Sequence, residues 1–192
     1  MHLEVAKVYH IYNRGNNKGT IFFKEDNYLL FKDKLGNLIV PYCELLCWCL
    51  MPNHFHLMIL ATESGCQERN SFGGKPMQTF PYKTGVLLSS YSQLMNKQNK
   101  TTGSLFQQKT KSKLLSTEND IIRCMHYIHQ NPFRAGLAKG LEEWQYSSFG
   151  EYTGCNKSRL CHVQALFDLT GYNKEQFAAD SYKIIEDSQA FY

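Results

Sequence analysis

The stretch Leu50–Ile59, LMPNHFHLMI, places two histidines one residue apart inside an otherwise apolar run. Its Met-Pro-Asn segment is typical of a turn, so residues 41–60 are predicted to form two strands joined there. Because side chains alternate along a strand, His54 and His56 point to one face, and the apolar residues between and after them point to the other. Two imidazoles whose Cα atoms lie about 6.5–7 Å apart form either a hydrogen-bonded pair on a half-buried sheet or half of a metal site. The hairpin alone leaves both interpretations open.

Outward from this hairpin, turn residues and apolar spacing predict the element order β-α-β-β-α-β, followed by further helices. That order is typical of an α+β protein with a ferredoxin-like (RRM-like) fold, in which helices cover one face of an antiparallel sheet. We expect the other face to be open to a ligand, with no second core. The predicted strands lie at 5–15, 41–60 (two strands) and 103–116, and the predicted helices at 25–38, 83–100 and 117–132.

A chain of 192 residues suits one domain with appendages. We expect residues 1–160 to form that domain, with a long surface loop at 62–81 that is rich in Ser, Gly, Pro and Gln. Residues 161–192 are expected to form a helical C-terminal extension, with two short helices around Gly171.

Composition excludes several classes of protein. No apolar run approaches the roughly 20 residues of a membrane span, and the first residues show no secretion signal. Seven cysteines occur without a CxxC pair, which argues against a disulfide framework and against a zinc ribbon. We therefore expect reduced thiols and a cytoplasmic location, with no membrane partner.

Charge is unevenly distributed along the chain. Residues 161–192 hold two lysines and five acidic residues, so the net charge of +4 divides into +7 before this segment and −3 within it. Between Asn96 and Lys113 there are five lysines and no acidic residue. A basic patch attracts polyanions such as nucleic acids, although a solvated lysine face would have the same composition.

The predicted helix at 117–132 carries the residues that can complete a site at the histidine pair. Arg123, Tyr127 and Asn131 follow one another at intervals of four residues, so they share one face of the helix, which we expect to be exposed. A guanidinium, a phenol and a carboxamide in line resemble a phosphate-handling site. By pattern alone, however, Tyr127 is also suited to packing in a half-buried position.

At this point the sequence resembles a known family, the HUH-type single-tyrosine transposases, and most closely their REP-associated tyrosine transposase branch. Five segments occur in the order and approximate spacing of that family, and they span residues 5–152. They are YHIYNRGNNKGTIFF, CLMPNHFHLMI, GSLFQQKTKSK, MHYIHQNPFRAGL and EEWQYSSFGEY. The resemblance implies the same ferredoxin-like fold and a single-stranded DNA substrate, often beside an imperfect hairpin, that is cut and rejoined at one position.

The resemblance also implies roles for individual residues. His54 and His56 correspond to the metal-binding pair, Tyr127 to the nucleophile, and Asn131 to the polar third ligand. Arg14 lies in the family's NRG turn, near the expected DNA. A site of two imidazoles and one carboxamide oxygen suits Mg²⁺ or Mn²⁺. One departure is Gln108-Lys109-Thr110, which stands where the family often has GRY; a lysine there cannot make the bidentate phosphate contact of an arginine.

Further residues are assigned from the pattern. Lys109, Lys111 and Lys113 alternate along the predicted fourth strand, and we expect them and Arg123 to contact the DNA backbone. His10 and Tyr12 share a face of the first strand, where they either line the site or, as we prefer, pack in the core. His126 and His129 lie neither on the face of Tyr127 nor on the apolar side of the same helix, and are expected at the surface.

Two hypotheses from different classes follow. The first is a DNA transposase, or site-specific single-stranded DNA nuclease and strand transferase, that acts through a 5′-phosphotyrosine intermediate with a divalent metal. Because each chain carries one nucleophile, a homodimer is then expected for complete strand exchange. The second is a catalytically inactive module that binds structured DNA or RNA on the same fold. The coexistence of both histidines, the tyrosine and the asparagine favours the enzyme.

Overall fold

A four-stranded antiparallel sheet forms the centre of the protein, in a computed structural model that describes residues 1–70, 74–156 and 160–183. The order of the strands is β2-β3-β1-β6, and every neighbouring pair is antiparallel. This order and the alternation with helices confirm the predicted ferredoxin-like α+β fold. The strands are β1 (Val8–Arg14), β2 (Cys43–Met51), β3 (His54–Ala61) and β6 (Lys111–Leu115).

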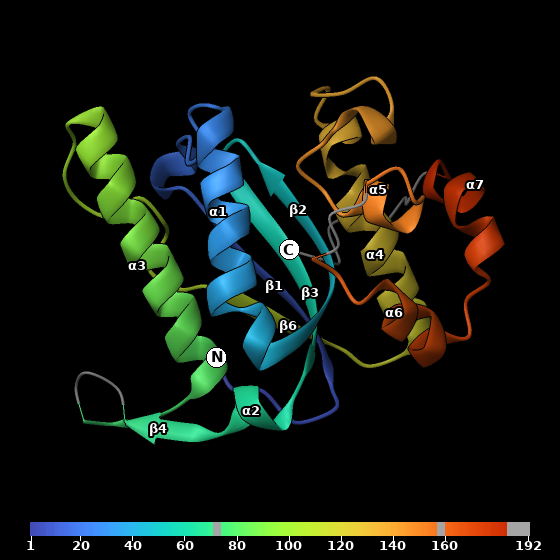
Figure 1. Ribbon diagram of the computed structural model, residues 1–192, viewed down its shortest axis with the longest axis horizontal. Coiled ribbons are helices and arrows are strands. Elements are labelled where there is room, and N and C mark those ends of the chain that lie inside the picture. The colour runs from blue at the N-terminus through green and yellow to red at the C-terminus, as the bar shows by residue number, and fades with distance from the viewer. Residues whose placement is uncertain (71–73, 157–159, 184–192) are drawn as a thin grey trace.

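Helices cover both faces of this sheet, as Figure 1 shows. On one face lie α1 (Glu25–Leu38) and α3 (Thr79–Asn99). On the other lie α4 (Glu118–Arg134), α5 (Phe149–Tyr152), α6 (Val163–Thr170) and α7 (Phe177–Ser181). Single 3-10 turns are formed by Asn16–Lys18, Val40–Tyr42, Leu141–Glu143 and Lys174–Gln176. None of the helices described is long and apolar enough to cross a membrane.

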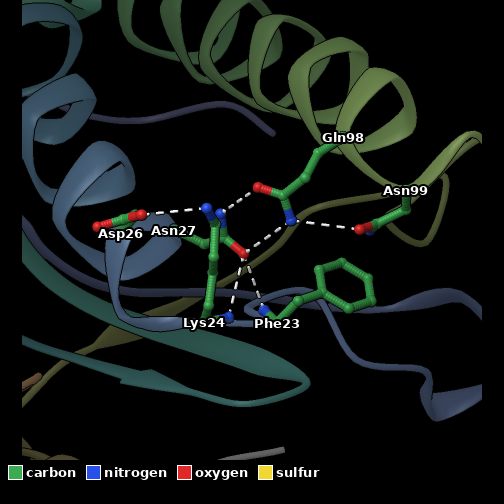
Figure 2. Close-up of polar contacts among 6 residues, drawn as sticks. All are labelled: Phe23, Lys24, Asp26, Asn27, Gln98 and Asn99. Atoms are coloured by element: carbon green, nitrogen blue, oxygen red, sulfur yellow. Dashed lines mark hydrogen bonds and ion pairs between the residues drawn. The ribbon is translucent and has the colours of Figure 1, made fainter.

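The first core lies between the sheet and the α1–α3 pair. Phe55, Leu57 and Ile59 of β3 point into it, as the alternation predicted, and they pack with Phe31 of α1. The ends of the two helices are joined by polar contacts, which Figure 2 shows. Asn27 Oδ1 accepts hydrogen bonds from the backbone amides of Phe23 and Lys24, just before α1, and its Nδ2 donates to Gln98 Oε1 of α3 at 2.9 Å. Helix α1 is therefore fixed at its N-terminal end.

The second core, between the sheet and α4, corrects the prediction of one open sheet face. Cys47 of β2 and Met58 of β3 pack there with Met125 and Ile128 of α4. The sequence of β2, CELLCWCLM, is apolar at almost every position rather than at alternate ones, which is the signature of a strand buried on both faces. Helix α4 begins at the Thr117 cap, whose side chain accepts a hydrogen bond from the backbone amide of Asp120.

The segment 62–81 is not the long loop that we predicted. It contains a one-turn helix, α2 (Glu63–Cys66), a two-stranded ribbon of β4 (Glu68–Asn70) and β5 (Pro76–Gln78), and the first turn of α3. Arg69 of the ribbon lies over the Tyr82 ring at 3.9 Å and ties the ribbon to α3. A cation–π contact and such short strand pairing leave no periodic trace in the sequence.

The segment from residue 161 is helical at the two predicted places, and α6 ends at Gly171 with φ of +60°. Leu166 and Phe167 of α6 and Phe177 of α7 contribute to the second core. These helices therefore pack on α4 as part of the same structure. The remainder of the predicted extension, residues 184–192, lies outside the described residues.

Candidate active site

The histidine pair lies on the sheet face that α4 covers. In the antiparallel pairing of β1 with β3, Arg14 is opposite His54 and Tyr12 is opposite His56. Residues opposite each other in such a pair share a face. The rings of His54 and His56 are 4.9 Å apart in an edge-to-face arrangement. The sheet therefore brings both imidazoles together, as the spacing in the sequence predicted.

A third histidine, His10 of β1, belongs to this site. Its Nε2 lies 2.9 Å from Nδ1 of His56, and its ring stacks on His56 at 5.0 Å and on Tyr12 at 4.8 Å. A hydrogen bond to one ring nitrogen fixes the tautomer and the orientation of a ligating histidine. Our preference for His10 as a core residue accounts for its full burial but missed this contact. The signal available was that His10 and Tyr12 share one strand face.

Helix α4 brings Tyr127 and Asn131 over the histidines. The Tyr127 ring is 5.6 Å from His56 and 6.0 Å from His10, with its plane nearly perpendicular to both. Asn131 donates its Nδ2 to the Tyr127 carbonyl oxygen at 2.8 Å. The predicted exposure of this helix face is right at Arg123 but wrong at Tyr127 and Asn131, which are 2% and 8% exposed. The face shared by these residues is turned to the sheet.

Burial and nearby positive charge keep both predicted ligands neutral. Burial lowers the pKa of His54 to about 4, and the Arg14 charge adds to this, while contact with the Asn131 carboxamide acts in the opposite direction. Burial also lowers the pKa of His56 well below its ordinary value, with further contributions from His10, His54 and Arg14. A neutral imidazole is the form of histidine that binds a metal.

A cavity of about 50 Å³ opens beside the histidines. Its walls include His54 and His56 together with Arg14, Lys109 and Lys111, so five of the predicted site residues meet there. The Nε atom of Arg14 is buried and has no hydrogen-bond acceptor among the described residues. A buried guanidinium N–H without an acceptor is costly, and an anion such as a phosphate would satisfy it.

The predicted DNA-binding lysines and Arg123 lie at different distances from the histidines. Strand β6 begins at Lys111, so Lys109 precedes the strand instead of alternating within it. Lys113 is opposite His10 in the β1–β6 pairing and Lys111 is opposite Tyr12, so both lie on the histidine face of the sheet. Arg123 is exposed at the start of α4, and within the described part of the chain no contact joins it to the histidines.

The donor set fits the divalent cation that the resemblance implies. Nε2 of His54 is buried and lacks a hydrogen-bond partner of normal geometry among residues 1–70, 74–156 and 160–183. Over the same residues, no group of three or more His, Cys, Asp or Glu side chains could hold a metal ion. Oxygens of neutral side chains do lie beside His54: the Asn131 carboxamide contacts it, and Asn53 Oδ1 is 2.6 Å from its Nδ1.

Two other histidines of α4 are buried, which contradicts their predicted place at the surface. Nδ1 of His126 is 3.1 Å from Ser181 Oγ of α7, and Nε2 of His129 is 2.8 Å from Ser148 Oγ. Burial lowers the pKa of His126 to about 4 and that of His129 to about 3. The residues that bury them lie beyond residue 147 in the chain. The spacing of residues within a helix cannot predict which later segment packs on it.

Comparison with known proteins bears on the fold of the chain. No family model matches the chain, and no curated protein matches it either. Among solved structures, a REP-associated tyrosine transposase bound to a REP hairpin matches with a TM-score of 0.60 and 13% identity, over 80% of this chain and 83% of the other. The chain has the fold of that transposase. A bacterial tRNA(His) guanylyltransferase-like protein in complex with GTP also matches, with a TM-score of 0.42 and 9% identity over 68% of this chain and 64% of the other, too low to indicate a shared fold.

Proposed function

We propose that this protein is a DNA transposase: a site-specific single-stranded DNA nuclease and strand transferase that uses a 5′-phosphotyrosine intermediate and Mg²⁺ or Mn²⁺. The observation that carries the proposal is the position of Tyr127, whose ring lies 5.6 Å from one member of the paired histidines. The two histidines belong to β3 and Tyr127 belongs to α4, two elements far apart in the chain. A phenol beside two neutral imidazoles, a carboxamide and a buried guanidinium is suited to phosphoryl transfer.

The chain's own residues supply the covalent chemistry. The Tyr127 oxygen attacks the phosphorus, a Tyr–O–P bond forms, and the bond from phosphorus to the 3′ oxygen breaks. The phenol gives up its proton to water, and the leaving 3′ oxygen takes a proton from water. The reverse attack by a 3′ hydroxyl rejoins the strand. The phosphodiester bond is thereby exchanged instead of being lost to hydrolysis.

The surrounding side chains hold the phosphate. Arg14 offers a buried N–H to a phosphate oxygen, and Lys109 and Lys111 place ammonium groups on the wall of the same cavity. His54, His56 and Asn131 would hold the divalent cation. When bound, that cation neutralises charge on a non-bridging phosphate oxygen. His10 orients His56 through the hydrogen bond between their rings.

The substrate is proposed to be a single-stranded DNA segment beside a hairpin. The chain has the fold of a transposase whose structure holds a REP hairpin, and its basic residues flank the cavity. Because Tyr127 is buried, the helix or the ring must move before the oxygen can reach a phosphate. One nucleophile per chain means that complete strand exchange requires two chains, so we propose a homodimer for transposition. This reaction would take place on DNA in the cytoplasm.

Trapping the covalent intermediate tests the proposal. The protein is incubated with end-labelled single-stranded hairpin DNA and Mn²⁺, then denatured and separated by electrophoresis. We expect a labelled adduct with the native protein and none with Tyr127→Phe, which keeps the buried ring and so preserves the fold. Tyr172→Phe, which removes a hydroxyl bonded to Asp180 at a distance from the site, is the matched control and should give the adduct.

Two results would contradict the assignment. An adduct that persists in Tyr127→Phe would show that another residue is the nucleophile. Tight DNA binding without an adduct under any condition would instead favour the second hypothesis, a catalytically inactive nucleic-acid-binding module.

A further inference from the structure

A large groove lies between α3 and the segment that leads into β6. Its volume is about 830 Å³, within the range of sites that hold small ligands. One wall is the side of α3 that carries Gly85, Ser89 and Gln93, and the other is residues 103–110. We name this feature the α3 groove. It extends from α3 to residues that also line the cavity at the histidines.

The α3 groove is polar but almost uncharged. No acidic residue lines it, and Lys109 is the one charged side chain among its lining residues. The side chains of Ser89, Gln93 and Gln108 make no hydrogen bond within the described part of the chain, so their donors and acceptors are open to a ligand. Leu88 and Met77 add apolar surface. Amide groups with open hydrogen bonds beside apolar surface suit the edges and faces of nucleobases.

The groove is continuous with the candidate active site. Asn13, Gln107 and Lys109 line both the α3 groove and the cavity beside the histidines. The junction is held in place by Asn13, whose Nδ2 donates to the Gln107 carbonyl oxygen at 3.2 Å and to Thr110 Oγ1 at 3.0 Å. A DNA strand with one phosphate in the cavity would therefore have its next nucleotides in the α3 groove.

We infer that the α3 groove binds the bases of the single-stranded nucleotides adjoining the phosphate that is cut. Their phosphates would lie toward Lys109 and Lys111, where the positive charge is, and their bases toward Gln93 and Gln108. Pairing occupies the Watson–Crick edges of the bases and stacking covers their faces, so the groove would select single-stranded DNA over duplex. This inference rests on the proposed function, because it takes the cavity as the place of the reacting phosphate.

Filling the groove tests this inference. Gly85 lies inside α3, and a Cβ built there meets no atom within 4 Å, so a side chain at this position extends into open space. Gly85→Trp places a large ring in the groove, and replacing a helix-interior glycine favours the helix. Leu94→Trp is the matched control, because Leu94 is exposed on the same helix but does not line the groove.

The measurement is fluorescence anisotropy with two labelled DNA hairpins, one blunt and one with a single-stranded extension, in the absence of divalent metal. The Tyr127→Phe form of each protein is used, so no cleavage occurs. The extension should tighten binding by at least tenfold in the parent and in Leu94→Trp. Gly85→Trp should lose that gain while binding the blunt hairpin as the parent does. The double variant Gln93→Ala and Gln108→Ala, which adds no bulk, should also lose most of the gain in affinity that the extension gives.

Equal tightening by the extension in the parent and in both groove variants would overturn the inference. The inference would also be overturned if the extension did not raise the DNA affinity of the parent protein. Failure of the proposed function is distinguishable, because it appears as an absent adduct in the trapping experiment, whereas this binding measurement requires no reaction.

Discussion

Replacing His10 by phenylalanine separates orientation of a metal ligand from packing. The substitution keeps an aromatic ring in a fully buried position, between Tyr12 and His56, but removes the nitrogen that lies 2.9 Å from His56 Nδ1. His56 then loses the partner that fixes its tautomer. The ring positions of Tyr127 and His54 are not directly altered.

The expected loss follows from the geometry. Partners that orient a ligating histidine contribute about 10- to 100-fold to metal affinity, which corresponds to about 1.4–2.8 kcal/mol. A buried hydrogen bond whose partner is removed costs a similar amount, about 1–3 kcal/mol. We therefore expect His10→Phe to bind Mn²⁺ about 10- to 100-fold more weakly than the native protein.

Titration calorimetry with Mn²⁺ measures this affinity directly and requires no DNA. His126→Phe is the control, because it also replaces a buried histidine by phenylalanine but lies outside the site, and its Mn²⁺ affinity should equal that of the native protein. If folded His10→Phe binds Mn²⁺ within twofold of the native protein, the hydrogen bond between the rings does not orient a ligand, and the reasoning is refuted.

Two further predictions concern stability and DNA binding. Because burial lowers the pKa of His126 to about 4, the unfolded chain takes up this proton first as pH falls below about 6.5, and the folded state loses stability down to pH 4. We expect His126→Gln to remove about 2–3 kcal/mol of the stability lost between pH 7 and pH 4.5, measured by urea unfolding; an unchanged pH dependence would contradict this. Lys111→Ala should lower the slope of log K against log salt for single-stranded DNA by about 0.7, whereas the exposed Lys174→Ala should leave it unchanged; equal slopes for both would exclude a phosphate contact at Lys111.

Local patterns predicted the sheet and the histidine face because those patterns have a fixed geometric meaning. Alternation placed His54 and His56 together and sent Phe55 into the first core. The same reasoning failed for the segment 62–81, where the short strands pair through backbone hydrogen bonds and Arg69 packs on Tyr82. Such contacts depend on segments meeting in space and have no repeat that a sequence could display.

Helix α4 shows more clearly what the spacing of residues in a sequence cannot predict. Its spacing predicted that Tyr127 and Asn131 share a face, and they do, but not that this face is buried against the sheet. The outcome depended on β2, which is apolar on both sides and required a second cover. His126 and His129 became buried for the same reason, because α7 and the segment near Ser148 close over the helix.

By itself, the sequence determined the order of the four sheet strands and of α1, α3 and α4, the side of β3 on which both imidazoles lie, and the resemblance that assigns a role to Tyr127. Only the tertiary structure decided that this phenol meets His56, that His10 is hydrogen-bonded to His56, and that the α3 groove joins the cavity. The reason is physical: periodicity fixes the direction of a side chain relative to its own strand or helix. The distance between two elements is set by the side chains that pack between them.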